Sequence, residues 1–275
     1  MPTFDTPGTA NLRIRNAAGM VAIEAAETDQ TTVSLEALRD DDATREAIER
    51  ATVEANRNDV VVELGENKGF GFGSVSISFG RTPQVGIRIR CPEGSRVDCA
   101  TASADLKASG RLGDVEMKSA SGDLSLQHVG ALRAQSASGD VRATAVDGEA
   151  RVQTVSGDVR LGPVGGQISA TLVSGDFQAE DGASDVSVKT VSGDQRVDAI
   201  REGEIKLQSV SGDIRLGVRP GTRLQIQANT TSGDINSDFD VKDSPSSTPT
   251  GSEARLQIKT VSGDIALVRA AAASL

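Results

Sequence analysis

Apolar residues recur at every second position along most of this chain, in short runs that end at the tripeptide Ser-Gly-Asp. In the run that leads to Asp213, one face carries Ile205, Leu207, Ser209 and Ser211. A period of two is typical of β-strands with one buried face. The pattern therefore predicts strands whose inner face also holds the hydroxyl side chains, including the serine of the tripeptide.

The tripeptide recurs at nearly constant spacing. It occupies residues 121–123, 138–140, 156–158, 174–176, 192–194, 211–213, 232–234 and 262–264. A degenerate copy, Ser103-Ala104-Asp105, precedes the first and makes nine units. Residues one and three positions after the Asp are apolar, as in Val159 and Leu161, and a glycine usually marks a second corner. Each unit therefore predicts a strand, a Gly-Asp turn, a shorter strand and a second turn.

Units of about 18 residues with both strands apolar inward predict an all-β fold, a single-stranded β-solenoid (β-helix) of about nine or more coils. Like residues then stack about 4.8 Å apart. We expect a right-handed winding, which is the usual hand of strand crossovers. The alternative is a stack of hairpins in an open antiparallel sheet or sandwich. A left-handed hexapeptide helix is set aside because Gln167 breaks its six-residue spacing.

The domain prediction has three parts: residues 1–96, the solenoid at 97–269 with a polar loop inserted at 240–254, and a tail at 270–275. The first part is β-rich and either continues the solenoid or caps it. Its alternation stops near 42–56, where Asp42 as an N-cap and an alanine-rich stripe predict one short helix. A cap is needed because an open end coil exposes unpaired backbone N–H and C=O groups and the apolar side chains of its core.

Composition excludes several classes of function. The net charge is −10 and the pI is about 4.7, which disfavours binding to nucleic acid or to anionic membranes. The chain has no Trp and no Tyr, so it lacks the rings on which sugars and unpaired bases usually stack. Cys91 and Cys99 have neither disulfide nor metal-site spacing, and we expect two reduced, buried thiols. No cofactor is predicted.

The N-terminal residues lack the apolar core of a signal peptide, and no apolar run is long enough for a transmembrane helix. We therefore expect a cytoplasmic protein with no direct membrane insertion. Localisation at the cell surface by another export route is the alternative.

The stacked aspartates are the sharpest chemical feature. Carboxylates on neighbouring coils repel each other, so something must offset the repulsion. One hypothesis is a Ca²⁺ ladder, because hard cations prefer carboxylate oxygens. Its members would be Asp123, Asp140, Asp158, Asp176, Asp194 and Asp213. The favoured interpretation is structural: each Asp accepts turn N–H bonds and faces a basic residue two positions on, as Asp158 faces Arg160.

The sequence gives little support for catalysis. His128 is the single histidine, and a Ser-His-Asp triad built on it has no recognisable pattern. Polysaccharide-active β-helices need a carboxylate pair with sugar-stacking rings, and no such cluster stands out. We predict no enzyme and no catalytic residues.

Two features suggest a surface for partners. The position three before the Asp is valine in five units: Val155, Val173, Val191, Val210 and Val261. By parity these side chains face outward, although a twist at the corner could turn them inward instead. The second feature is the glycine-rich stretch 65–83, where Phe70 and Phe72 are a candidate docking tip.

The chain resembles the bacterial putative-adhesin family of β-strand-repeat proteins, a domain of unknown function. The resemblance rests on the recurrent units TVSGDVRL and SVSGDIRL, and on the stretches LRIRNAAGMVAIEA and CPEGSRVDCATASADL. It extends over residues 8–268. It implies a β-solenoid and a non-enzymatic role linked to surface adhesion or the cell envelope, with no catalytic residues to transfer.

We therefore predict a structural or interaction protein that binds a protein partner or self-associates. The alternative is a carbohydrate- or Ca²⁺-binding module.

Overall fold

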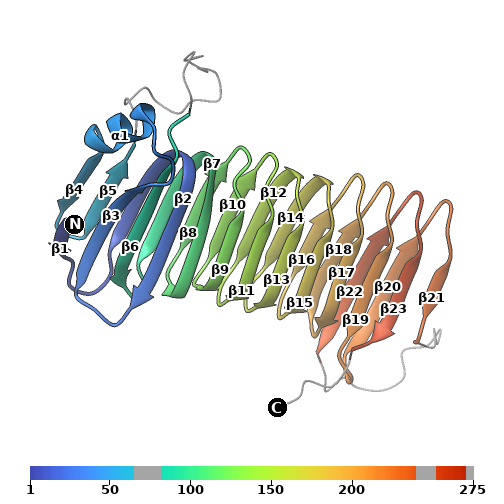
Figure 1. Cartoon of the computed structure of the whole chain (residues 1–275). Coiled ribbons are helices and arrows are strands. Elements are labelled where there is room, and N and C mark those ends of the chain that lie inside the picture. The colour runs from blue at the N-terminus through green and yellow to red at the C-terminus, as the bar shows by residue number, and fades with distance from the viewer. Residues whose placement is uncertain (65–81, 240–251, 271–275) are drawn as a thin grey trace. The chain divides into compact units, whose positions relative to one another are not determined.

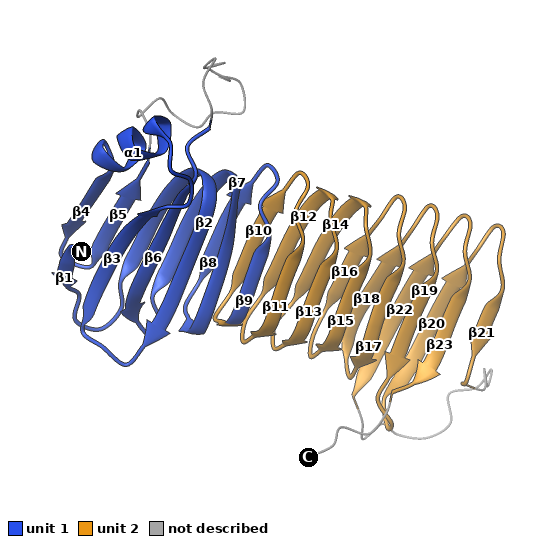
Figure 2. Cartoon of the chain, in the orientation of Figure 1, with its two compact units in different colours: residues 1–127 blue, residues 128–275 orange. Residues whose placement is uncertain are grey.

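The computed structural model describes residues 1–64, 82–239 and 252–270, and they form an all-β protein with one helix in the described part. The chain divides into two compact units, residues 1–127 and 128–275 (Figure 2). Phe70, Phe72 and most of the predicted 240–254 loop lie outside the described residues.

Unit 1 is built around two long parallel strands. Its elements are β1 (Thr3–Asp5), β2 (Asn11–Ala26), β3 (Gln30–Ala37), α1 (Asp42–Glu49), β4 (Thr52–Asn56), β5 (Asp59–Glu63), β6 (Val85–Pro92), β7 (Arg96–Leu112), β8 (Val115–Ser119) and β9 (Leu124–Val129), the last of which ends in unit 2. Strand β2 pairs in parallel with β5 near its start, with β6 near its end and with β7 along most of its length. Strands β1, β3 and β4 add antiparallel pairs, which the uniform repeat did not predict.

The helix is shorter than the sequence predicted. It begins after Asp41, whose side chain accepts a hydrogen bond from the Thr44 N–H at 2.8 Å, and it ends at Glu49. The prediction of helix to residue 56 is wrong, because Thr52–Asn56 form β4 and pair with β5. The β-branched Thr52 and Val53 favour this strand, and the buried Val60 and Val62 of β5 give it a partner.

Unit 2 is a stack of coils whose described strands pair only in parallel. Its strands are β10 (Leu132–Ser136), β11 (Val141–Val146), β12 (Ala150–Ser156), β13 (Val159–Val164), β14 (Ile168–Ser174), β15 (Phe177–Gly182), β16 (Val186–Lys189), β17 (Gln195–Ile200), β18 (Gly203–Gln208), β19 (Ile214–Val218), β20 (Arg223–Asn229), β21 (Ile235–Ser237), β22 (Glu253–Lys259) and β23 (Ile265–Arg269). Each coil contributes two strands. Each strand pairs in register with the corresponding strand of the next coil, as β10 does with β12 and β11 with β13. This is the predicted single-stranded β-solenoid; its handedness stays a prediction.

The core of unit 2 consists of columns of like residues. One column runs through Ile168, Val186, Ile205 and Leu256, all of them fully buried. The predicted inward positions after each Asp are also buried, as Val159 and Leu161 illustrate. Parallel pairing with identical register places identical positions one strand spacing apart, so each coil continues the core of its neighbour.

The last two coils do not follow the order of the sequence. Strand β22 pairs with β18 on one side and with β20 on the other, and β23 lies in the same way between β19 and β21. The coil of residues 253–269 is therefore internal, and the earlier coil of residues 223–237 is the end coil (Figure 1). The last two coils therefore do not stack in sequence order.

Apolar content explains the exchange. The internal coil buries Ala254, Leu256, Ile258, Ile265 and Leu267. The end coil has no buried residue in β20 or β21. Placing the more apolar coil between two neighbours removes more apolar surface from water than the sequential order would.

Candidate interaction surface

The Gly-Asp corner is fixed by backbone and side-chain hydrogen bonds between neighbouring coils. At five corners of unit 2 the glycine N–H donates to the serine carbonyl of the adjacent coil, for example Gly193 to Ser211 at 3.0 Å. The residue after the Asp donates to the next Asp carbonyl, for example Gln195 to Asp213 at 2.9 Å. The Asp N–H points toward the preceding coil, as that of Asp213 does, and needs a different acceptor.

The aspartate side chains provide that acceptor. Oδ1 of Asp194 accepts the N–H of Asp213 at 2.8 Å, and Oδ1 of Asp213 accepts that of Asp264 at 2.8 Å. The same bond, at 2.8–3.0 Å, joins Asp105 to Asp123, Asp140 to Asp158, Asp158 to Asp176, Asp176 to Asp194 and Asp264 to Asp234. The aspartate ladder, defined by these residues, therefore has a structural role, and the N–H dipoles offset part of the repulsion between the carboxylates.

Basic residues compensate the ladder less regularly than predicted. Arg160 donates to Asp158 at 2.9 Å, as expected. Arg196 instead donates to Asp198, on its own strand, at 2.5 Å. Among the described residues no group of three or more His, Cys, Asp or Glu side chains is arranged to hold a metal ion. The calcium hypothesis thus gains no geometric support.

One prediction separates these two roles of the ladder. Asp194→Ala removes the acceptor for the Asp213 N–H, and we expect it to lower the free energy of unfolding by about 1 kcal/mol. Asp194→Asn keeps an oxygen acceptor and removes one negative charge, so we expect stability within about 0.5 kcal/mol of the original. Urea denaturation with and without Ca²⁺ provides the measurement. Equal destabilisation by both variants, with a stabilising effect of Ca²⁺ on the unmodified chain, would favour the cation ladder.

The serine of the tripeptide does not face the core. Ser103, Ser192 and Ser211 are exposed, so their predicted inward orientation is wrong. The strands that lead to Ser192 and Ser211 end before the corner, and these two serines meet only through an isolated bridge. The buried hydroxyls lie two positions earlier, where Thr190 and Ser209 are in contact at 3.1 Å between the oxygens.

The five predicted valines are exposed in an unbroken row, which we name the valine stripe: Val155, Val173, Val191, Val210 and Val261. Their exposed fractions are 46–52%, so the corner does not twist them inward. The carbonyls of Val191 and Val210 accept the N–H groups of Ser211 and Ser262 on the next coils, both at 2.9 Å. These bonds hold the valines of adjacent coils next to one another. Because of the exchanged coils, Val261 is the direct neighbour of Val210.

The remaining predicted residues have structural surroundings. His128 Nε2 lies 2.7 Å from Asp147 Oδ1, in a partly exposed pair. Cys91 and Cys99 are free and buried, as predicted. Burial raises the pKa of the Cys91 thiol to about 11 and that of Cys99 to about 12, so both are protonated at neutral pH.

No helix in the described part of the chain has the length and apolar character needed to cross a membrane.

The stacked parallel coils define a β-solenoid repeat protein. The sequence model described as Toastrack DUF4097 matches residues 9–268, and the chain belongs to this family. No curated protein matches it.

Three of the solved structures that match the chain are described as putative adhesins. That from Bacteroides fragilis NCTC 9343 has 15% identity and a TM-score of 0.38, and the match covers 97% of this chain and 95% of the other. Those from Parabacteroides merdae ATCC 43184 and Parabacteroides distasonis ATCC 8503 have 13% and 10% identity and TM-scores of 0.44 and 0.45. These two matches cover 98% and 97% of this chain, and 95% of each neighbour. Similarity at this level says nothing about function.

Proposed function

We propose that this protein is a non-enzymatic structural and interaction protein that self-associates through the valine stripe, in an adhesin-like or envelope-associated role. The observation that supports the proposal is the stripe itself: five half-exposed valines on five neighbouring coils. Contiguous apolar side chains on a soluble protein are typical of interaction sites. Cytoplasmic localisation stays a prediction from the sequence.

A second copy is the partner that fits the spacing of the stripe. The valines recur once per coil, about 4.8 Å apart. A copy related by a two-fold axis presents a row with identical spacing, so the side chains of the two rows can interdigitate along the whole stripe. The serines Ser174, Ser192 and Ser211 border the stripe and are uncharged, so no like charges oppose each other along this border.

The test is a pair of charged substitutions. Val191→Asp with Val210→Asp places two carboxylates in the centre of the stripe, and we expect the dimer to dissociate while the fold is kept. The molar mass from light scattering, measured over a concentration series, should halve relative to the unmodified chain. Thr144→Asp with Gln178→Asp adds the same two charges to the outer faces of β11 and β15 and should leave the dimer intact. An unmodified chain that is monomeric at every concentration would refute the proposal.

A further inference from the structure

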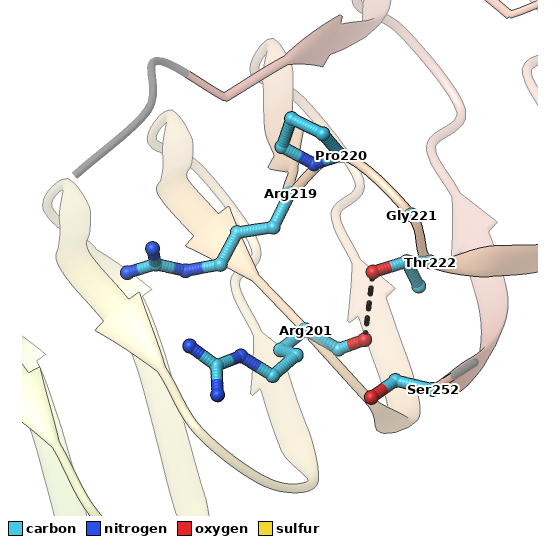
Figure 3. A pocket seen from close by; sticks show the side chains of 6 residues that line it. All are labelled: Arg201, Arg219, Pro220, Gly221, Thr222 and Ser252. Carbon is cyan, nitrogen blue, oxygen red and sulfur yellow. Dashed lines mark hydrogen bonds between the residues drawn. The ribbon is translucent and has the colours of Figure 1, made fainter. Parts of the chain in front are cut away.

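A small pocket interrupts the regular surface of unit 2 where the repeat is irregular. It has a volume of about 290 Å³ and is lined by Arg201, Arg219, Pro220, Gly221, Thr222 and Ser252 (Figure 3). Arg201 follows β17, and the other residues follow β19 or precede β22. No pattern in the sequence singled out this pocket, because its residues belong to corners that differ from the repeat.

Local structure explains why the two arginines share one wall. Ile200 and Val218 are register partners, and the Arg219 N–H donates to the Ile200 carbonyl at 2.9 Å. Arg201 and Arg219 are therefore neighbours in one column, on adjacent coils. The corresponding corners of earlier coils carry Gly165 and Ala183. Figure 3 shows both side chains extending in the same direction.

Thr222, which also lines the pocket, is hydrogen-bonded to the backbone of Arg201. Thr222 Oγ1 donates to the carbonyl oxygen of Arg201 at 2.9 Å (Figure 3). This bond links the longer turn at 219–222 to the corner of the preceding coil.

The charges at the pocket do not balance. Arg219 forms an ion pair with Asp181, which lies two coils away, so its side chain crosses the coil that carries Arg201. Its buried Nε has no hydrogen-bond acceptor among the described residues. Arg201 is exposed and has no ion pair in the described part of the chain. Arg219 thus has one carboxylate partner and Arg201 has none among the described residues, although the whole chain carries a net charge of −10.

We propose that this pocket binds a small ligand through a carboxylate or phosphate group. The planar guanidinium donates pairs of hydrogen bonds that match the oxygens of both anions, and a bound anion would neutralise the remaining positive charge. The volume is just below the roughly 300–1,000 Å³ of usual ligand pockets, which limits the ligand to about the size of one acidic sugar or sugar phosphate. The site is separate from the valine stripe, and neither proposal depends on the other.

Calorimetric titration of the full chain tests the proposal, with inorganic phosphate and glucuronate as anionic probes and glucose as the neutral control. We expect at least one anion to bind and glucose not to bind. Arg201→Gln should weaken binding about tenfold, because one charge-assisted pair of hydrogen bonds is lost. Arg201→Lys keeps the positive charge but loses the paired guanidinium donors, so its affinity should lie between those of the original chain and Arg201→Gln. Arg151→Gln, at an exposed arginine on β12, should bind like the original chain.

Several outcomes overturn the proposal. The proposal is wrong if neither phosphate nor glucuronate binds, or if glucose binds as tightly as the anions. It is also wrong if Arg201→Gln binds the anion with unchanged affinity. Circular dichroism of each variant confirms that a loss of affinity is not a loss of fold. Binding of phosphate alone or of glucuronate alone supports the proposal and identifies which group the ligand carries. Because Arg201 is exposed and has no ion pair among the described residues, we expect its substitution to leave the fold unchanged.

Discussion

Replacing Gly193 with alanine is expected to disrupt the coils around it and to lower the free energy of unfolding by about 3 kcal/mol or more. A Cβ at this position would lie 2.1 Å from the carbonyl oxygen of Gly175 on the neighbouring coil. That atom is backbone, and it cannot move away without breaking the corner hydrogen bonds. The φ of +138° adds strain for any residue with a side chain.

Gly221→Ala is the matched control for this substitution. Gly221 also has a positive φ, +86°, but a Cβ there would meet no atom within 4 Å. We expect it to cost about 1–2 kcal/mol from backbone strain alone. Urea denaturation followed by circular dichroism compares the two. If Gly193→Ala were no worse than Gly221→Ala, close stacking of the corners would not be the reason for the repeated glycine.

Substitutions in one core column should reveal the order of the last coils. Ile205, Leu256 and Ile226 are successive members of a single column. Leu256 is 0% exposed between its two neighbours, and Leu256→Ala should cost about 2–5 kcal/mol. Ile226 is 37% exposed on the end coil, and Ile226→Ala should cost about 1 kcal/mol.

Stacking in sequence order would reverse this result, because Ile226 would then be internal and Leu256 terminal. Ile205→Ala is the reference, since Ile205 is buried in either arrangement. Urea midpoints of the three variants, measured at one protein concentration, provide the comparison. A larger loss for Ile226→Ala than for Leu256→Ala would contradict the exchanged order.

The solenoid fold could be predicted from the sequence because a constant repeat interval places equivalent positions of successive units beside one another. The alternation within one unit therefore also describes its pairing with the next. Period-two alternation identified buried residues such as Leu207 and Leu161, and the constant interval predicted parallel stacking. Parity indicated that the valines face outward but left an inward twist as the alternative, and the structure shows them exposed. Its function as an interface stays a prediction.

The incorrect predictions have physical causes that a local pattern does not contain. Parity placed Ser211 inside, but the strand ends before the corner and the chain turns away. The order of the last coils depends on the relative apolar content of two distant segments. The pocket at Arg201 and Arg219 arises from corners of unequal length on adjacent coils, and each arginine alone is an ordinary surface residue.

The exchanged coils also determine when the array can be completed during synthesis. A chain made from its N-terminus at about 5–20 residues per second presents residues 223–237 before residues 253–269 exist. The end coil cannot reach its final neighbours, β22 and β23, until those strands have been translated. Either it waits unpaired, or it first pairs with β18 and β19 and is later displaced. In either case the last two coils of the solenoid cannot be completed in the order in which they are translated.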